Sequence, residues 1–213
     1  MLTISEIFYS IQGESTYAGQ PCVFVRLTAC DLRCRWCDTP YAFTGGRRMA
    51  VDDVLAQIAT WSCDLVEITG GEPLLQEDVY TLMACLLESG RTVLLETGGH
   101  LSVDRVPDGV RRVIDVKCPA SGESERHHWA NLDLLGQGDQ VKFVIQDRGD
   151  YDYARDVLVR HDLADRCGTV LFSPVHGALE PRVLARWILE DRLPVRLQLQ
   201  MHKYIWGAEA TGV

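Results

Sequence analysis

The segment VFVRLTACDLRCRWC (residues 23–37) joins an apolar run to three cysteines, Cys30, Cys34 and Cys37, spaced C-x3-C-x2-C. Two cysteines would be typical of a redox pair, and four would complete a tetrahedral zinc site. Three thiolates can instead hold three irons of a [4Fe–4S] cluster, whose open iron can bind a cofactor and pass it an electron. The spacing alone leaves a second interpretation open, a structural zinc site completed by a distant His or Cys.

The bulk composition is that of a globular protein. The chain has 213 residues, of which 46% are hydrophobic and 24% charged, and we expect a single domain over residues 1–213. No apolar stretch is long enough to cross a membrane, and the start lacks the regions of a signal peptide, so we expect a cytoplasmic protein without membrane contact. The net charge of −9 argues against non-specific nucleic-acid binding. Eight cysteines without an export signal are expected to be reduced thiols.

Strand patterns alternate with helical patterns along the chain. Strands are expected at 3–9, 22–27, 65–69, 92–96, 112–116, 140–145, 169–173 and 196–202, and helices at 51–61, 77–89, 151–161 and 180–191. The alternation predicts right-handed βαβ units and a mostly parallel sheet of the α/β class. Several connections, such as 117–139, are too short or too polar for a crossover helix, so we expect fewer helices than strands.

Polar side chains recur on one side of nearly every expected strand, because successive residues of a strand point to opposite faces. The members of this polar face are Arg26, Glu67, Thr69, Glu96, Asp115, Lys117, Lys142, Ser173, Gln198, Gln200 and His202. In an antiparallel sheet the pattern would mean only a face in contact with water. In a parallel chain we favour a curved sheet, an incomplete barrel, whose concave side holds a polar ligand and receives Lys117 and Lys142.

A second motif, Glu67-Ile68-Thr69-Gly70-Gly71-Glu72-Pro73, follows the next expected strand. Adjacent glycines allow close backbone approach and expose amide and carbonyl groups at a sheet edge. Backbone carbonyls and Glu72 can bind an ammonium group there. By itself the motif is also compatible with a simple tight turn, but after a C-x3-C-x2-C loop it is far more specific.

Together the two motifs resemble those of the radical S-adenosylmethionine enzymes. The resemblance implies that the open iron binds the amino and carboxylate groups of S-adenosylmethionine, which the reduced cluster cleaves to a 5′-deoxyadenosyl radical. A flavodoxin-like or ferredoxin-like electron donor is therefore implied. The cofactor contacts implied by the motifs are Trp36, Cys37, Asp38, Gly71 and Glu72. The later glycine-rich adenine motif of many members is not evident.

Further segments extend the match over almost the whole chain. They are IFYSIQGES (7–15), PCVFVRL (21–27), CDT (37–39) and QLQMHK (198–203), and they are similar to those of the 7-carboxy-7-deazaguanine synthase family. That family converts 6-carboxy-5,6,7,8-tetrahydropterin into 7-carboxy-7-deazaguanine with loss of ammonia, a lyase step toward queuosine and other 7-deazapurines. The resemblance implies an abridged, open TIM-like partial (β/α) barrel, a homodimer and the use of Mg²⁺.

The resemblance also assigns substrate and metal contacts. Arg26 is implied to pair with the pterin carboxylate, which a guanidinium fork binds bidentately. Thr39 is implied to ligate Mg²⁺ through its hydroxyl. The other implied substrate contacts are Ile11, Gln12, Gly13, Thr69, His202 and the terminal carboxylate of Val213. Further positions facing S-adenosylmethionine are Asp115, Val116, Lys117, Ser173 and His176. No catalytic residue is assigned beyond the cluster and this cofactor.

Two other functions remain open at this point. A radical S-adenosylmethionine activase, which installs a glycyl radical on a partner protein, shares the small size and the cysteine spacing. It has no need of Gln12-Gly13, Arg26 or Cys37-Asp38-Thr39. A scaffold stabilised by zinc or an iron–sulfur cluster would not be an enzyme, and metal analysis of protein purified without oxygen distinguishes it.

Overall fold

The computed structural model describes all residues, 1–213, and is built around one nine-stranded sheet. The strands are β1 (Leu2–Ile11), β2 (Pro21–Leu27), β3 (Arg47–Met49), β4 (Leu65–Gly70), β5 (Thr92–Thr97), β6 (Arg111–Asp115), β7 (Gln140–Ile145), β8 (Thr169–Pro174) and β9 (Arg196–Leu197). Their order is β3-β1-β2-β4-β5-β6-β7-β8-β9. β1 is antiparallel to β2 and β3, and every pair from β2 to β9 is parallel.

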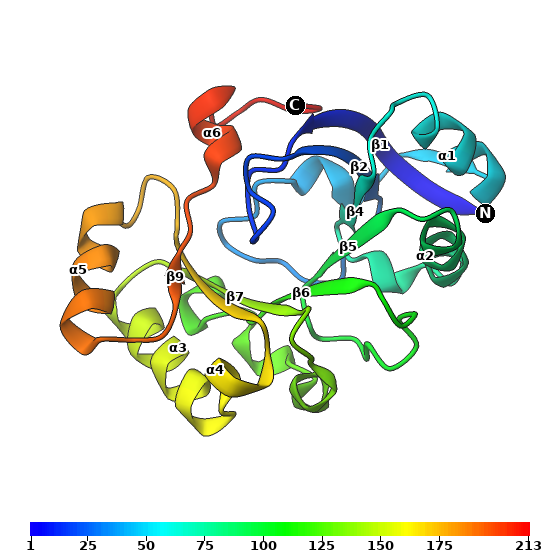
Figure 1. Cartoon of the computed structure of the whole chain (residues 1–213). Helices are drawn as coiled ribbons and strands as arrows, with labels where there is room; N and C mark the ends of the chain where they lie inside the picture. The colour runs from blue at the N-terminus through cyan, green and yellow to red at the C-terminus, as the bar shows by residue number, and fades with distance from the viewer.

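Six helices accompany the nine strands, which confirms the prediction of fewer helices than strands. They are α1 (Val51–Ile58), α2 (Asp78–Glu88), α3 (Arg148–Arg160), α4 (Leu163–Arg166), α5 (Pro181–Asp191) and α6 (Met201–Ile205). Figure 1 shows the sheet curving as an open, incomplete barrel, with α1 to α5 outside it and α6 near the C-terminus at one end. Three short 3-10 turns lie within the connection 117–139, where no crossover helix was expected.

The apolar face of the sheet packs against the outer helices, as the side-chain parity predicts. Phe143 of β7 and Phe172 of β8 contact each other edge-on, and Tyr151 of α3 packs against Phe172. The Tyr151 hydroxyl donates to the carbonyl of Trp187 at 2.9 Å and to a carboxylate oxygen of Asp191 at 2.8 Å. A fully buried ring thus keeps its polar end satisfied on α5.

One strand prediction was wrong in part. The segment 196–202 is a strand only at Arg196–Leu197, and Met201 already begins α6. The amide of Gln198 still donates to the carbonyl of Phe172, but that of Met201 donates to the carbonyl of Gly13 at 3.0 Å. The chain leaves the sheet because its backbone partners come from the loop after β1. His202 therefore lies on a helix rather than at a strand end. The sequence pattern did not predict β3, a three-residue edge strand, or α4, a single turn.

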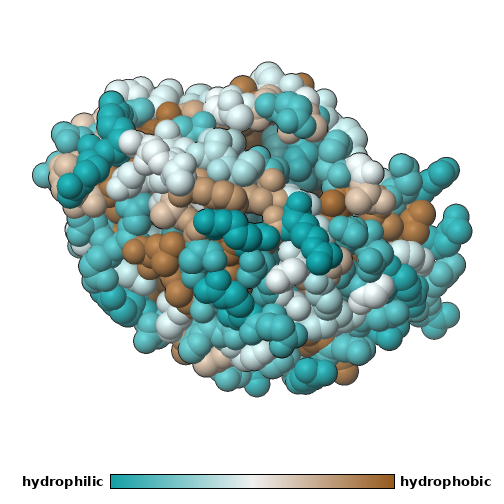
Figure 2. Space-filling view, turned by 180° about the vertical axis from the view of Figure 1, so that it is seen from behind, coloured by the Kyte–Doolittle hydropathy of each residue, from teal (hydrophilic) through white to brown (hydrophobic).

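No helix combines the length and the apolar character needed to cross a bilayer. The face seen in Figure 2 is mostly hydrophilic, and apolar side chains reach it in separate patches. This pattern is ordinary for a globular surface.

The helix α3 offers a matched test of this packing. Val157 is 1% exposed and lies in the core, whereas Val159, two residues later, is 73% exposed. Val157→Ala is expected to lower the free energy of unfolding by about 2 kcal/mol, because it leaves a cavity. Val159→Ala should change it by less than about 0.5 kcal/mol. Urea denaturation measures both, and equal effects would contradict the packing described.

Candidate active site

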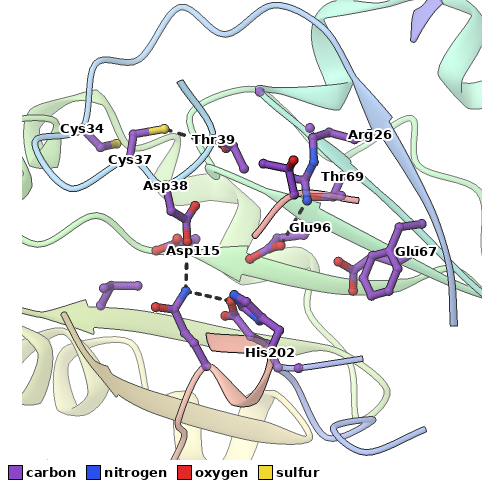
Figure 3. A pocket seen from close by; sticks show the side chains of 18 of the residues that line it. Arg26, Cys34, Cys37, Asp38, Thr39, Glu67, Thr69, Glu96, Asp115 and His202 are labelled. Atoms are coloured by element: carbon purple, nitrogen blue, oxygen red, sulfur yellow. Dashed lines mark hydrogen bonds between the residues drawn. The ribbon is translucent and has the colours of Figure 1, made fainter. Parts of the chain in front are cut away.

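A cavity of about 260 Å³ opens on the concave face of the sheet. It extends from the middle of the strands, where Glu67 of β4 and Lys142 of β7 lie, to the carboxyl ends of the parallel strands, where α/β folds bind their ligands. The site residues predicted from the sequence that line it are Ile11, Gln12, Gly13, Arg26, Cys30, Cys34, Trp36, Cys37, Asp38, Thr39, Thr69, Gly71, Glu72, Asp115, Lys117, His176, His202 and Val213. Figure 3 shows the two ends of this cavity, with Cys34 and Cys37 at one and Arg26 and Glu67 at the other.

Two predicted cofactor contacts are not among the residues that line the cavity. Val116 is 1% exposed, and its side chain packs in the hydrophobic core. It belongs to the apolar side of its strand end. Ser173 of β8 is also 1% exposed and does not reach the cavity.

The cysteine loop leaves β2 through a close contact with the end of β4. Ala29 adopts a left-handed backbone conformation, with φ at 82°. The amide of Gly71 donates to the carbonyl of Leu27 at 3.1 Å, and the amide of Glu72 donates to that of Ala29 at 2.7 Å. A Cβ at Gly71 would overlap the Ala29 carbonyl oxygen and lie 2.8 Å from the Cβ of Cys30. Position 71, the second glycine of the motif, therefore requires glycine, because the backbone at Ala29 approaches it too closely for a side chain.

The far side of the cysteine loop is held by the connection 119–126. The amide of Arg33 donates to a carboxylate oxygen of Glu123 at 2.6 Å, and the amide of Arg35 donates to the carbonyl of Ser121 at 3.1 Å. The Arg33 guanidinium donates to the carbonyl of Cys30 at 2.7 Å and lies over the ring of Phe43. The loop is thus fixed from two sides before any metal binds.

The three cysteines fit an iron–sulfur cluster. All three are free, half-buried thiols that line the cavity. Burial raises the pKa of Cys34 to about 11 and also raises that of Cys30, so these two thiols keep their protons until metal displaces them. No three His, Cys, Asp or Glu side chains are grouped tightly enough to hold a single ion. In a cubane each thiolate binds a different iron, so the sulfurs need not converge on one point.

Glu72 fastens the end of β4 to the end of β5. Its side chain is fully buried and accepts hydrogen bonds from the hydroxyl of Thr97 at 2.9 Å, the amide of Gly98 at 2.9 Å and the amide of Leu74 at 3.0 Å. Burial raises the pKa of this carboxyl, against these donors. Its oxygens are used by the protein itself, and contact with an ammonium group at Glu72 stays a prediction.

Lys142 of β7 stands at the centre of a buried charged array. Its ammonium contacts Glu14 at 3.0 Å, Glu96 by a short ion pair and Asp115 at 3.7 Å. Burial alone would lower the pKa of Lys142, but these three carboxylates hold it well above its usual range. Burial likewise opposes ionisation of Asp115, and Lys117 at 2.7 Å together with Lys142 keeps its pKa low. Both lysines face inward, as the side-chain parity predicts.

The helix α6 closes a second part of the cavity. Gln200, which precedes α6, donates to Glu14 at 3.0 Å and to Asp38 at 3.2 Å, and Lys203 lies 3.1 Å from Asp38. A Cβ at Gly13 would overlap the His202 ring and come within 2.9 Å of the His202 backbone nitrogen. The glycine therefore lets α6 dock on the loop after β1.

Several functional candidates had no assigned role in the sequence analysis. They are Glu14, Glu67, Glu96, Lys142, Gln200 and Lys203, all of which line the cavity. The parity of the strands had already placed Glu67, Glu96, Lys142 and Gln200 on the polar face. Glu14 and Lys203 lie in a loop and a helix, and only the fold brings them to the array.

Comparison with known proteins agrees with this geometry. Residues 25–118 match the model of the radical SAM superfamily. Two relatives, the 7-carboxy-7-deazaguanine synthases of Koribacter versatilis and Chlorobaculum tepidum, are each 48% identical over 100% of this chain and cover 100% and 97% of their own lengths. The crystal structure of Escherichia coli QueE matches with a TM-score of 0.73 at 22% identity, over 94% of each chain. Streptococcus suis SuiB bound to S-adenosylmethionine matches with a TM-score of 0.59 at 14% identity, over 81% of this chain and 48% of its own.

The curved sheet, the three-cysteine loop and the glycine pair define a radical S-adenosylmethionine enzyme, with a [4Fe–4S] cluster and S-adenosylmethionine as its cofactors. Within that class, the chain belongs to the 7-carboxy-7-deazaguanine synthase family, as its full-length identity to curated members shows. The predicted fold class, an open partial barrel with mostly parallel strands, is confirmed by the topology and by the match to QueE.

The glycine pair gives a direct test of the cluster loop. Gly71→Ala is expected to reduce iron incorporation severalfold, because its Cβ would push Ala29 and Cys30 together away from the end of β4. Gly136→Ala is a matched control, since its Cβ would meet only a carboxylate oxygen of Asp139 at 3.9 Å. Iron content after anaerobic reconstitution measures the effect. Equal loading of the two variants would show that the close approach is dispensable.

The buried Glu67 makes stability depend on pH. Burial, with the nearby Glu96 and Glu14 carboxylates, raises its pKa to about 8, well above the value of an unfolded chain. The folded state therefore binds an extra proton between about pH 4.5 and 8, and the contribution to stability is lost as pH rises through that window. Glu67→Gln should flatten the decline of the melting temperature over this range. An unchanged slope would mean that the carboxyl is already ionised in the folded protein.

Proposed function

We propose that this chain converts 6-carboxy-5,6,7,8-tetrahydropterin into 7-carboxy-7-deazaguanine with release of ammonia, in the route to queuosine and related 7-deazapurines. The observation that carries the proposal is one cavity with the three-cysteine loop at one end, Arg26 and Glu67 at the other, and the charged array around Lys142 in its lining. A small polar heterocycle with a carboxylate suits such a lining. The full-length relatives bear the name of a synthase for this product. The activase and scaffold alternatives are not favoured.

Arg26 is our proposed partner for the substrate carboxylate. Its Nε donates to a carboxylate oxygen of Glu6 at 2.7 Å, which fixes the plane of the guanidinium. The two Nη atoms have no protein partner and are not among the buried unpaired atoms, so they face the cavity. A guanidinium oriented in this way is ready for bidentate binding. Thr69, opposite Arg26 in the register of β2 and β4, flanks the same position.

The other end of the cavity holds the cofactors. When bound, the cluster and S-adenosylmethionine supply a 5′-deoxyadenosyl radical to the substrate. The chain contributes Cys30, Cys34 and Cys37 for the cluster, and we propose Trp36 and Gly71 as flanking contacts of S-adenosylmethionine. The residues near the C-terminus also line the cavity, and we propose that they keep water from the reacting carbon. These tail residues are Ala208, Ala210, Thr211, Gly212 and Val213.

Thr39 fits the proposed Mg²⁺ site. Its hydroxyl lies 3.8 Å from the sulfur of Cys37 and has no stronger protein partner. It lines the cavity beside Asp38. A single hydroxyl oxygen, completed by substrate oxygens and water, suits an ion that gives up its waters reluctantly. Mg²⁺ would orient the carboxylate and balance its charge during the rearrangement.

We further propose a cytoplasmic homodimer that receives electrons from a flavodoxin-like or ferredoxin-like donor and binds neither nucleic acid nor membrane. The resemblance of the chain to its family supports these statements. An exposed apolar patch on and beside α6, formed by Tyr204, Ile205 and Trp206, is available to a second copy. In this proposal residues 1–213 form a single radical S-adenosylmethionine domain.

The test is an anaerobic assay with 6-carboxy-5,6,7,8-tetrahydropterin, S-adenosylmethionine, Mg²⁺ and a reductant. Formation of 7-carboxy-7-deazaguanine and 5′-deoxyadenosine is expected. No deazaguanine from protein with an intact cluster would end the proposal.

Thr39→Ala is expected to raise the Mg²⁺ concentration needed for half-maximal activity about tenfold, because the protein then offers one ligand fewer. The exposed Thr60, whose hydroxyl donates to the carbonyl of Gln57, provides the control variant Thr60→Ala. An identical Mg²⁺ dependence in both variants would remove Thr39 from the metal site.

A further inference from the structure

Glu67 differs from every other acidic side chain of the cavity. The remaining carboxylates have fixed partners in the protein: Lys142 for Glu14 and Glu96, Lys117 for Asp115, Lys203 for Asp38, and two backbone amides with a hydroxyl for Glu72. Glu67 is 6% exposed, yet it has neither a cationic partner nor a backbone amide. Its single hydrogen-bond partner is Gln12.

The orientation of Gln12 leaves one oxygen of Glu67 free. The amide of Glu14 donates to Oε1 of Gln12 at 3.0 Å, which turns Nε2 of Gln12 toward Oε2 of Glu67. Oε1 of Glu67 has no protein partner and is not among the buried unpaired atoms, so it is accessible from the cavity. A carboxylate with a free oxygen is an acceptor for a ligand that donates.

Glu67 lies at the apolar end of the cavity. On its two neighbouring strands the residues in register with it are Phe24 and Leu94, which pack with Cys22 and Leu65 in a small separate cluster. Burying a carboxyl in such surroundings without a charged partner costs stability. The cost is understandable if the group binds a ligand, because strongly perturbed acids in clefts mark functional sites.

The position of Glu67 relative to Arg26 restricts the chemical groups of a ligand that can bind both residues. Arg26 pairs with Thr69 in the register of β2 and β4, and Glu67 is two residues before Thr69 on β4, roughly 7 Å along the strand. The side chains of Arg26 and Glu67 both face the cavity from the same side of the sheet (Figure 3). A ligand that uses both needs an anionic group at one end and hydrogen-bond donors at the other. A bicyclic pterin with a carboxylate carries its ring N–H and adjacent amino group at the end away from that carboxylate.

We propose that Glu67 determines specificity by accepting hydrogen bonds from the amino-pyrimidinone edge, the ring N–H and its neighbouring amino group, of a pterin or deazaguanine in the cavity. This inference rests on the proposed function and deepens it. The substrate and the product share this edge, so Glu67 accepts hydrogen bonds from both. An oxo group in place of the amino group would put an acceptor against the carboxylate and be rejected.

Binding should also release a proton. The raised pKa of Glu67, about 8, means that the empty site is largely protonated at neutral pH, whereas two donors require the ionised carboxylate. The titratable and charged groups facing Glu67 from neighbouring elements are Glu14, Cys22, Glu96 and Lys142. Burial and the carboxylates of Glu96 and Glu14 outweigh the ammonium of Lys142, so Glu67 ionises only as pH approaches 8. Affinity for the donor edge is expected to rise over the same pH range.

The experiment compares two probes that do not turn over, pterin-6-carboxylate and lumazine-6-carboxylate, in which an oxo group replaces the 2-amino group. Both are titrated into the anaerobically reconstituted full chain without reductant, and binding is followed by fluorescence. In the wild type we expect a preference for the pterin, and in Glu67→Gln a preference reduced about ten- to a hundredfold, the range of a charged hydrogen bond. Glu77→Gln, an exposed carboxylate paired with Arg105, should leave the preference unchanged.

An unchanged preference in folded Glu67→Gln would overturn the inference. Glu67→Leu is the second variant, since an apolar side chain suits Phe24 and Leu94. If Glu67 serves to recognise the ligand, Glu67→Leu should have a melting temperature at or above that of the wild type and should lose the preference for the pterin. A folded Leu variant that keeps the preference would also overturn it. Turnover is measured separately, so absence of product from the wild type would contradict the proposed function without deciding the role of Glu67.

Discussion

The close contact between the ends of β2 and β4 is the constraint on which the site depends. Two backbone hydrogen bonds, from Gly71 to Leu27 and from Glu72 to Ala29, set where the cysteine loop begins. Space for a side chain at position 71 is absent. Glu72 then extends the same connection to β5 through Thr97 and Gly98. The loop that carries the cluster is therefore aligned with the strand ends that line the rest of the cavity.

A second constraint is the concentration of charge on the concave face. A parallel sheet normally has both faces covered by helices, but here one face is open and polar. Lys142 contacts three carboxylates, and their negative charges stabilise its ammonium in this buried place. Glu67 is the acidic residue of the cavity that has neither a cation nor a backbone amide as its partner. The carboxylates with fixed partners and the unpaired Glu67 make the cluster end and the apolar end of the cavity chemically different.

The sequence predicted much of the fold because its signals were local. Alternating parity located β2 and β4 to β8, and it correctly turned Lys117 and Lys142 inward. The cysteine loop and glycine pair were recognised because their chemistry depends on spacing within one segment.

The features that the sequence did not predict depend on contacts between residues that are distant in sequence. The segment 198–202 leaves the sheet because Gly13, nearly the whole chain away, accepts the hydrogen bond that a strand would have used. The contact between Gln12 and Glu67 likewise joins two segments that no local pattern connects.

Three sulfurs, and no fourth side chain, are expected to hold a four-iron cluster at this loop. Mössbauer and electron paramagnetic resonance spectra of the reconstituted protein, recorded with and without S-adenosylmethionine, test this arrangement most directly. We expect four irons per chain, one of which changes its signal when S-adenosylmethionine is added. A cluster whose irons are all indifferent to S-adenosylmethionine, or a colourless protein that contains zinc instead, would contradict it.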